Sequence, residues 1–377
     1  MEKKNKAPGG AVRVLMLVCG FLVFIGIGAF MAFDIINYLG GDLGFAEYYL
    51  WLAVYLLVFY AVYFVQIIVH ESGHLVFGII TGYKFSSFRI GNVIITKAKG
   101  KLKFARFSIA GTLGQCLLSP PESKDGKIPY RLYNFGGVIF NVLFALICFA
   151  LYWLLPQIHI LSAALMVSAT IGLWIAASNG IPMRGTVNND GYNGISLGKD
   201  LHALRSFSNQ LRVNARMTNG ESLRDMPREL FELPDGANAG NPINATIKVF
   251  ACNRLMDEGR FAEARALCET LIADEAVLPI YKNMLTCDIA FCEMIAGECE
   301  RAASRFNKEL IKFMSLMAKN PSIVRTQYAH AMLCEKNDEK AKKYLESFEK
   351  IAKKHPYKGD IQSEREFLAE VERAVKK

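Results

Sequence analysis

Four long apolar segments dominate the first half of the chain. A membrane-spanning helix needs about 20 predominantly apolar residues. Segments of that kind lie near residues 12–36, 48–76, 133–155 and 158–178. Neither residues 48–69 nor residues 135–178 contain Lys, Arg, Asp or Glu. The pattern therefore predicts a mainly α-helical membrane core with about four spans.

The first segment has a second interpretation, a secretory signal sequence. The apolar region of such a signal covers about 7–15 residues, whereas residues 11–37 carry one charge, Arg13, before Asp34. No small-x-small cleavage site follows it cleanly. We therefore favour a true membrane span.

Between the second and third apolar segments, the pattern indicates strands. Residues 87–96 and 101–110 are rich in Ile, Val, Phe and Ser around a KAKGK turn, so we expect a small cytoplasmic β-hairpin. Its free edge could pair with an extended peptide, because strand addition supplies main-chain hydrogen bonds. The alternative is a hairpin that lies on the lipid surface with its lysines at the headgroups.

From about residue 240 the sequence is polar and helix-forming. Three similar units contain LMDEGRFAEARALCETLI, MIAGECERAASRFNKELI and LCEKNDEKAKKYLESFEKI. Gly259, Gly297 and Asn337 mark their turns at spacings of 38 and 40, and Ala262, Ala302, Ala341 or nearby small residues would let the helices cross. The turn chemistry resembles tetratricopeptide repeats, although that repeat has about 34 residues. An ordinary helical bundle is the alternative, and either would bind a protein partner.

These patterns divide the chain into four regions. We expect a cytoplasmic tail (1–10), a membrane domain (11–205), a linker region (206–242) and a soluble, cytoplasmic helical domain (243–377).

The formal charge of +9, in a chain that is 52% hydrophobic, is concentrated in particular loops. Cytoplasmic loops of membrane proteins carry an excess of Lys and Arg. Residues 84–131 contain ten such residues, whereas residues 38–47 contain none. The alternation predicts a multi-pass protein of the cell membrane with both termini cytoplasmic. The basic charge thus reports topology and does not indicate nucleic-acid binding.

The nine cysteines are odd in number, and no two have Cys-x-x-Cys spacing. We therefore expect reduced thiols in the cytosol, and neither a disulfide framework nor a cysteine-ligated zinc site.

The sequence IIVHESGHLVFGI places His70, Glu71 and His74 within an apolar segment, near the cytoplasmic end of the second span. Helical residues four apart share a face, so both imidazoles can bind one Zn²⁺ ion. Glu71 is then the catalytic base, and zinc lowers the pKa of its water to about 7. A chance match would bury these groups without compensation. Gln66 extends the polar stripe, and Gly73 is small enough for a neighbouring helix to approach closely.

A catalytic zinc site needs a third protein ligand. By the predicted topology, His159 and Asp34 lie at the opposite membrane face. Asp190, in SNGIPMRGTVNNDGYNG after the fourth span, remains. Its alternative role is an ordinary Asp-Gly turn.

Together these residues resemble the site-2 protease family of intramembrane zinc metalloproteases. The resemblance covers about residues 47–195 and includes HESGH, residues 85–115, and Asn179, Pro182 and Asp190-Gly191. NFGGVIFNVLFAL resembles the family's Gly-Pro-x-x-Asn helix, in register from Gly137 to Asn141, with Val138 in place of proline.

The resemblance implies that His70, His74 and Asp190 hold zinc, that Glu71 is the acid/base and that the β segment presents the substrate. Asn141 would either position the substrate backbone or tie two helices together. The expected function is hydrolysis of a peptide bond in a membrane protein or small peptide precursor near the cytoplasmic face. The alternatives are a catalytically inactive scaffold and, from the polar membrane residues, a transporter.

Overall fold

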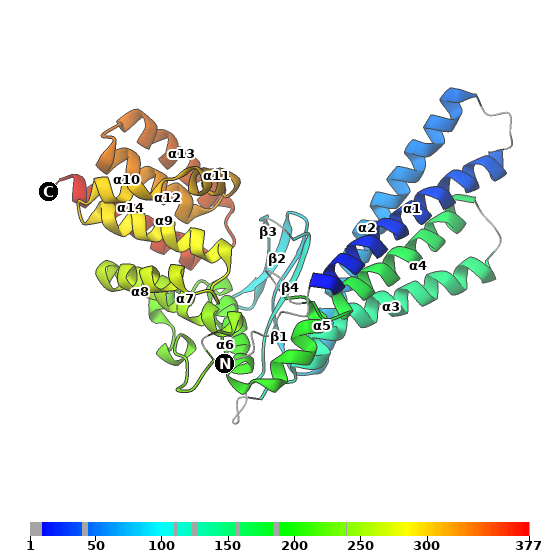
Figure 1. Ribbon diagram of the computed structural model, residues 1–377, viewed down its shortest axis with the longest axis horizontal. Helices are drawn as coiled ribbons and strands as arrows, with labels where there is room; N and C mark the ends of the chain where they lie inside the picture. The colour runs from blue at the N-terminus through cyan, green and yellow to red at the C-terminus, as the bar shows by residue number, and fades with distance from the viewer. Residues whose placement is uncertain are drawn as a thin grey trace. The chain divides into compact units, whose positions relative to one another are not determined.

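The computed structural model of the protein describes residues 10–39, 44–108, 112–122, 127–155, 159–183, 188–238 and 240–376. The chain forms two compact units (Figure 1). One comprises residues 1–83 and 129–199, and the other comprises residues 84–128 and 200–377. The predicted tail, residues 1–10, lies outside the described residues except for Gly10. The predicted domain boundaries stay predictions.

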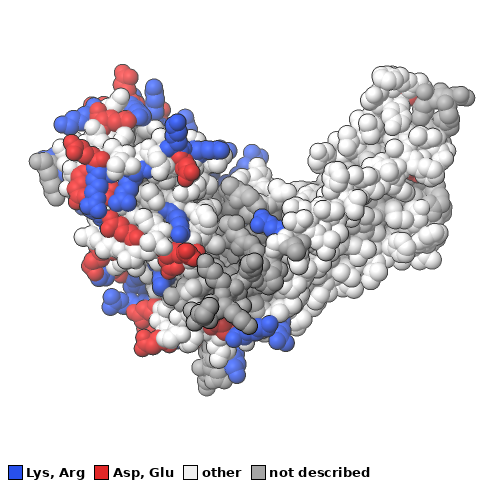
Figure 2. All heavy atoms as spheres, in the orientation of Figure 1, with Lys and Arg blue, Asp and Glu red and all other residues white. Residues whose placement is uncertain are grey.

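The first unit contains four long helices, followed by a short helix α5 and a 3-10 turn η1. Their bounds are α1 Gly10–Leu39, α2 Phe45–Ile80, α3 Tyr130–Leu154, α4 His159–Gly180, α5 Asp190–Ser196 and η1 Leu197–Lys199. The four long helices are apolar and long enough to cross a membrane, which confirms the predicted mainly α-helical core with four candidate spans. Large apolar side chains such as Leu57 (70% exposed) and Leu154 (79% exposed) form an outer surface suited to lipid. On the face drawn in Figure 2, these helices show almost no charge, whereas charged side chains gather over the helices of the second unit.

The apolar core of this unit joins α1, α2 and α4. Ile35 of α1, Tyr55 of α2 and Ile171 of α4 are almost completely buried in one cluster. Helix α3 packs against α2 and α4 and contributes the buried Ala145.

Helices α2 and α3 approach each other backbone to backbone at glycine residues. A Cβ atom added to Gly73 would lie 2.1 Å from the carbonyl oxygen of Gly136. A Cβ atom added to Gly136 would lie 2.4 Å from the carbonyl oxygen of Gly73. This is the close crossing that small residues permit in membrane helices, as the sequence predicted for Gly73.

The second unit begins with an antiparallel sheet whose strand order is β3-β2-β1-β4. The strands are β1 Lys84–Ile90, β2 Val93–Ala98, β3 Lys101–Arg106 and β4 Gly114–Ser119. The predicted hairpin is present as β2 and β3, with Lys99 and Gly100 at positive φ in its turn. The single strand expected at residues 87–96 is wrong, because Gly91 (φ 57°) turns the chain between β1 and β2. Glycine adopts this left-handed conformation without steric cost.

The helices of the second unit follow the sheet. Their bounds are α6 Leu201–Thr218, η2 Leu223–Asp225, η3 Arg228–Leu230, α7 Pro242–Asp257, α8 Phe261–Ala273, α9 Pro279–Ile295, α10 Cys299–Arg305, α11 Lys308–Leu316, α12 Pro321–Ala329, the π-helical turn η4 His330–Cys334, α13 Asp338–Lys354 and α14 Lys358–Val375. Phe291 of α9, Ala329 of α12 and Phe348 of α13 are fully buried in the largest core cluster.

Each of the three predicted turn residues lies between two helices, and the two glycines take the left-handed conformation. Gly259 (φ 72°) and Gly297 (φ 82°) separate α7 from α8 and α9 from α10. In the third unit Lys336 (φ 51°) takes the left-handed position, and Asn337 instead caps α13 by accepting a hydrogen bond from the backbone N–H of Lys340. The small buried residue of the first unit is Ala264, whereas Ala262 is exposed. The likeness to tetratricopeptide repeats stays a prediction.

The expectation that every cysteine is a free thiol is wrong for one pair. Cys299, at the start of α10, and Cys334, at the end of η4, form a disulfide across 35 residues of sequence, with a Cα–Cα distance of 5.3 Å. Sequence spacing did not reveal the pair because packing of α10 against η4 brings these residues together.

The glycine crossing predicts opposite effects for one substitution at two positions. Gly136→Ala should destabilise the protein by about 1–3 kcal/mol, because the new methyl group overlaps the α2 backbone. Gly26→Ala on α1 should be neutral or stabilising by up to about 1 kcal/mol, because nothing lies within 4 Å of its Cβ position and alanine favours helix. Thermal unfolding of the detergent-solubilised variants measures both. Equal midpoints would contradict the close crossing.

Candidate metal centre

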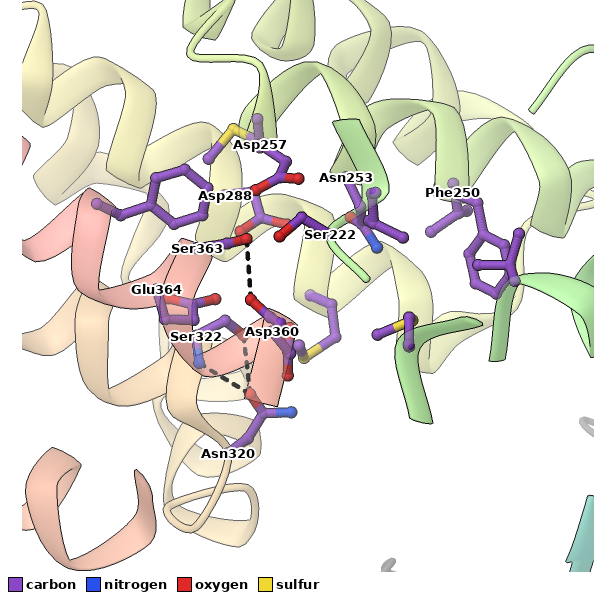
Figure 3. A pocket seen from close by; sticks show the side chains of 18 of the residues that line it. Ser222, Phe250, Asn253, Asp257, Asp288, Asn320, Ser322, Asp360, Ser363 and Glu364 are labelled. Carbon is purple, nitrogen blue, oxygen red and sulfur yellow. Dashed lines mark hydrogen bonds between the residues drawn. The ribbon is translucent and has the colours of Figure 1, made fainter. Parts of the chain in front are cut away.

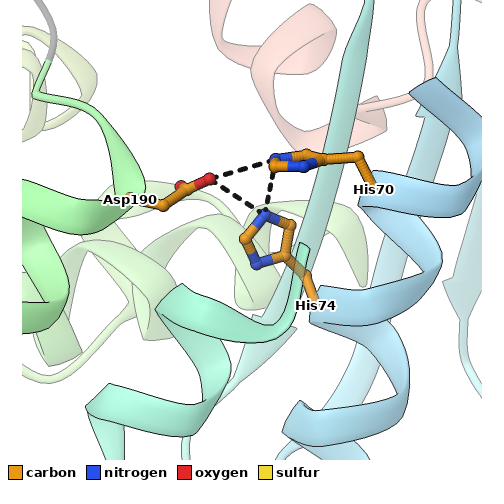
Figure 4. A group of neighbouring side chains, drawn as sticks. All are labelled: His70, His74 and Asp190. Atoms are coloured by element: carbon orange, nitrogen blue, oxygen red, sulfur yellow. Dashed lines mark hydrogen bonds and ion pairs between the residues drawn. The ribbon is translucent and has the colours of Figure 1, made fainter. Parts of the chain in front are cut away.

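His70 and His74 lie one helical turn apart on α2 and point toward Asp190 of α5 (Figure 4). The Nε2 atoms of the two histidines are 3.2 Å apart. Oδ2 of Asp190 lies 3.0 Å from Nε2 of His70 and 3.4 Å from Nε2 of His74. Both imidazoles are about 8% exposed. The structure therefore brings together the three ligands predicted from the sequence.

The other nitrogen of each imidazole is engaged by α3. Nδ1 of His74 lies 2.7 Å from the backbone carbonyl oxygen of Tyr133, and Nδ1 of His70 lies 2.7 Å from Oδ1 of Asn141. A carbonyl oxygen only accepts, so each Nδ1 carries the proton. In the neutral tautomer Nε2 then presents a lone pair to the site. A hydrogen bond to the second nitrogen is the usual way in which a protein orients a metal-binding histidine.

Asp190 is positioned by the residue before it. Oδ1 of Asn189 accepts hydrogen bonds from the backbone N–H groups of Met183 and Tyr192. Nδ2 of Asn189 donates to the carbonyl oxygens of Ser178 and Ile181. This capping residue therefore joins the start of α5 to the end of α4. Gly191 completes the junction, since a Cβ atom there would lie 2.0 Å from the carbonyl oxygen of Gly180.

The three ligand atoms form a set that requires a positive charge. Two imidazole lone pairs and a carboxylate oxygen repel one another at 3.0–3.4 Å unless a cation or proton lies between them. Ligands of a tetrahedral zinc ion, at bond lengths of about 2.0–2.1 Å, are about 3.3 Å apart. Among the described residues, His70, His74 and Asp190 form the cluster of three His, Cys, Asp or Glu side chains whose possible ligand atoms all lie within 4.8 Å of one another. The donor chemistry and spacing fit zinc.

Asn141 connects this centre to the core of the bundle. Its Nδ2 donates to the backbone oxygen and to Oε1 of Gln66, at 3.1 and 2.8 Å. Gln66 in turn donates from Nε2 to the carbonyl oxygen of Ser168 on α4. Asn141 is fully buried. The geometry favours the helix-tie role among the two alternatives and adds an orienting contact to His70, while the substrate-positioning role stays a prediction.

His159, which the predicted topology excluded as a ligand, lies at the opposite end of the helix bundle from His70 and His74. His159 starts α4 and contacts Tyr55 and Asp34, which lie near the start of α2 and the end of α1. Helix α4 rises about 30 Å over its 22 residues, so His159 is remote from the metal ligands at the other end of the bundle.

Comparison with known families supports the interpretation of this site. The family model described as "Peptidase family M50" matches residues 58–354, which is most of the chain and includes all three ligands. The chain belongs to peptidase family M50. This is the site-2 protease family that the sequence resembles, and its members are generally zinc-dependent membrane proteases. No curated protein and no solved structure matches the chain significantly.

Two positioning residues of this M50 peptidase were missed in the sequence. Asn189 carried a usable signal, because an Asn directly before Asp-Gly is a favourable helix cap. Tyr133 carried none, since it contributes a backbone carbonyl oxygen that any residue type would supply.

The contact between Asn141 and His70 predicts a loss of metal affinity in this M50 peptidase. Asn141→Leu should weaken zinc binding about 10–100-fold, because it removes the acceptor for His70 Nδ1. Competition with a chromophoric chelator measures the affinity. Thr170→Val is the control, since Thr170 also lies on a membrane helix, donates to the carbonyl oxygen of Met166 in its own helix and does not contact the site. Equal affinities in the two variants would contradict the orienting role.

Proposed function

We propose that the protein is an intramembrane zinc endopeptidase. It hydrolyses a peptide bond in a membrane-embedded protein or a small peptide precursor, near the cytoplasmic face. The observation that carries this proposal is the convergence of His70, His74 and Asp190 at one end of an apolar helix bundle in an M50 chain. The inactive-scaffold and transporter alternatives have no comparable observation in their favour.

Bound zinc would supply a Lewis acid that polarises the scissile carbonyl and makes water acidic near pH 7. His70, His74 and Asp190 would hold it through Nε2, Nε2 and a carboxylate oxygen. Glu71 follows His70 on α2 and is buried. Its carboxylate takes a proton from the attacking water and passes it to the leaving amide nitrogen, so the C–N bond breaks and one water molecule is consumed.

The edge strand β3 is the proposed contact for an extended substrate. It is hydrogen-bonded on one side to β2, and it carries the exposed side chains of Leu102 (60%) and Phe104 (74%). A peptide that adds to such an edge is held in extended form, with its peptide bonds no longer shielded inside a helix.

The proposed orientation places both termini in the cytoplasm and rests on the basic loop at residues 84–131. The Cys299–Cys334 disulfide speaks against it, because such bonds are rare in the cytosol. Loop charge is the stronger guide for short loops, so we retain a cytoplasmic C-terminus.

The proposed chemistry separates metal binding from proton transfer. Glu71→Gln should lower the cleavage rate of a membrane peptide by roughly 10²–10⁴-fold while zinc content stays unchanged. His74→Ala should lower both the cleavage rate and the zinc content. Glu47→Gln, on the exposed first turn of the same helix, should leave both unchanged. Zinc is measured by metal analysis of purified protein, and full cleavage by Glu71→Gln would contradict the role of Glu71.

The orientation is tested with reporter fusions. Fusions at residues 97–103 and at the C-terminus should report a cytoplasmic location, and a fusion at residues 40–45, of which 40–43 lie outside the described residues, should report the opposite side. An external C-terminus would overturn the orientation and agree with a stable disulfide.

A further inference from the structure

A cavity of about 260 Å³ lies among the helices of the second unit, and none of the three candidate metal ligands lines it. Helices α6, α7, α9, α12 and α14 and the loop after α6 surround it (Figure 3). Phe250, Met284, Leu285 and Phe367 supply apolar wall.

The polar part of the wall is strongly acidic. Among the described residues that line the cavity, the carboxylates are Glu221, Asp257, Asp288, Asp360 and Glu364, and the basic side chain is Arg325. Arg325 donates to Oδ1 of Asp288 at 2.5 Å and to Oε1 of Glu364 at 3.4 Å. Glu221 is paired outside the cavity wall with Arg216. One guanidinium therefore faces a larger number of carboxylates, and this excess favours a cation over an anion in the cavity.

Three buried polar atoms of side chains in this wall have no hydrogen-bond partner among the residues that the structure describes. Oδ1 of Asp257 and Oε2 of Glu364 are buried acceptors without a hydrogen bond, on side chains that are 4% and 5% exposed. Nε of Arg325 is a buried donor without one. A buried polar group without a partner destabilises the folded state. Carboxylate oxygens of this kind in the wall favour a ligand with cationic donors over one with acceptors.

The arrangement favours an organic cation over a metal ion. The carboxylates of this cavity are not among the described metal-ligating groups whose donor atoms gather within 4.8 Å. An apolar cavity of about 150 Å³ holds a benzene molecule, so this larger cavity accommodates a Lys or Arg side chain. The apolar wall suits the aliphatic stem of such a side chain, and the carboxylates suit its charged end. A peptide also carries main-chain carbonyl oxygens, which can accept a hydrogen bond from a guanidinium such as that of Arg325, whereas a simple amine lacks them.

We propose that this cavity binds a lysine or arginine side chain of an extended peptide. The peptide is the basic segment that flanks the membrane span of the substrate, an identification that rests on the proposed function. Cytoplasmic segments next to membrane spans are enriched in Lys and Arg. Recognition of such a segment selects membrane-anchored substrates and raises their effective concentration at the enzyme.

Charge at the wall makes this binding dependent on pH. Burial raises the pKa of Glu364 to about 8, although Arg325 opposes the shift, and burial raises the pKa of Asp360 to about 6. The other charged or titratable groups near the cavity include Asp257, Asp288 and Glu221, with Arg224 close to Asp257. His355 lies 3.8 Å from Asp360, and burial lowers its pKa to about 4, so it stays neutral between about pH 6 and 8. A bound cation favours the ionised carboxylates, so binding releases protons, and affinity should rise as the pH increases from about 6 to 8.

The test uses the full-length protein in phosphatidylcholine nanodiscs and a fluorescent ten-residue peptide with two Lys and two Arg residues. Fluorescence anisotropy should show saturable binding, at least tenfold weaker for a peptide with Gln at the four positions. The net charge of +9 on the protein opposes non-specific capture of a basic peptide. Asp360→Asn and Glu364→Gln should each weaken binding about tenfold or more, which is the measured size of a charged hydrogen bond.

Asp235→Asn and Glu346→Gln are the matched controls, since both residues are exposed and lie outside the cavity wall. Asp360 is half-buried, so its substitution keeps the test valid if Glu364→Gln fails to fold. Equal binding of the Lys/Arg and Gln peptides, unchanged binding by both cavity variants, or equally tight binding of free arginine would overturn the proposal. Binding of the basic peptide by a protein without peptidase activity would contradict the proposed function but not the cavity's preference for a basic side chain. Peptidase activity without binding of the basic peptide would contradict this inference but not the proposed function.

Discussion

The close approach of α2 and α3 at Gly73 and Gly136 is the constraint on which the candidate metal centre depends. Hydrogen bonds across 2.7 Å from His70 to Asn141 and from His74 to the Tyr133 carbonyl require the two helix backbones to lie almost in contact. A side chain at either glycine would separate the helices and open both bonds. Gly137 extends the same contact, because a Cβ atom there would lie 2.6 Å from the imidazole of His70.

Orientation of the histidines then determines the chemistry of the centre. Each Nδ1 proton is bound to α3, so both Nε2 lone pairs face Asp190. The carboxylate of Asp190 is positioned separately, by hydrogen bonds of Asn189 that join the start of α5 to the end of α4. Acceptors gathered in an apolar bundle gain stability when a cation joins them, and the same groups would be costly to bury without one.

The second unit concentrates charge in a different way. Arg325 is 1% exposed, stacks over Phe291 and pairs with Asp288 and Glu364. A buried network of this kind is strongly destabilised when one partner is removed. Carboxylate oxygens beside Arg325 have no partner among the described residues, and this is the physical argument for the proposed cationic ligand.

The sequence by itself determined the features that depend on local pattern and on burial in an apolar medium. Four apolar segments must form helices, because a membrane offers no other partner for their backbone groups. The spacing of His70 and His74 places both on one helix face, and the predicted topology left Asp190, after the fourth helix, as the candidate acidic ligand. Only the tertiary structure decided the contacts between distant segments. The backbone carbonyl of Tyr133, the cap at Asn189, the Cys299–Cys334 pair and the acidic cavity join residues whose sequence neighbours give no sign of the contact. Each depends on how helices cross, and crossing geometry is set by side-chain packing over the whole unit rather than by local spacing.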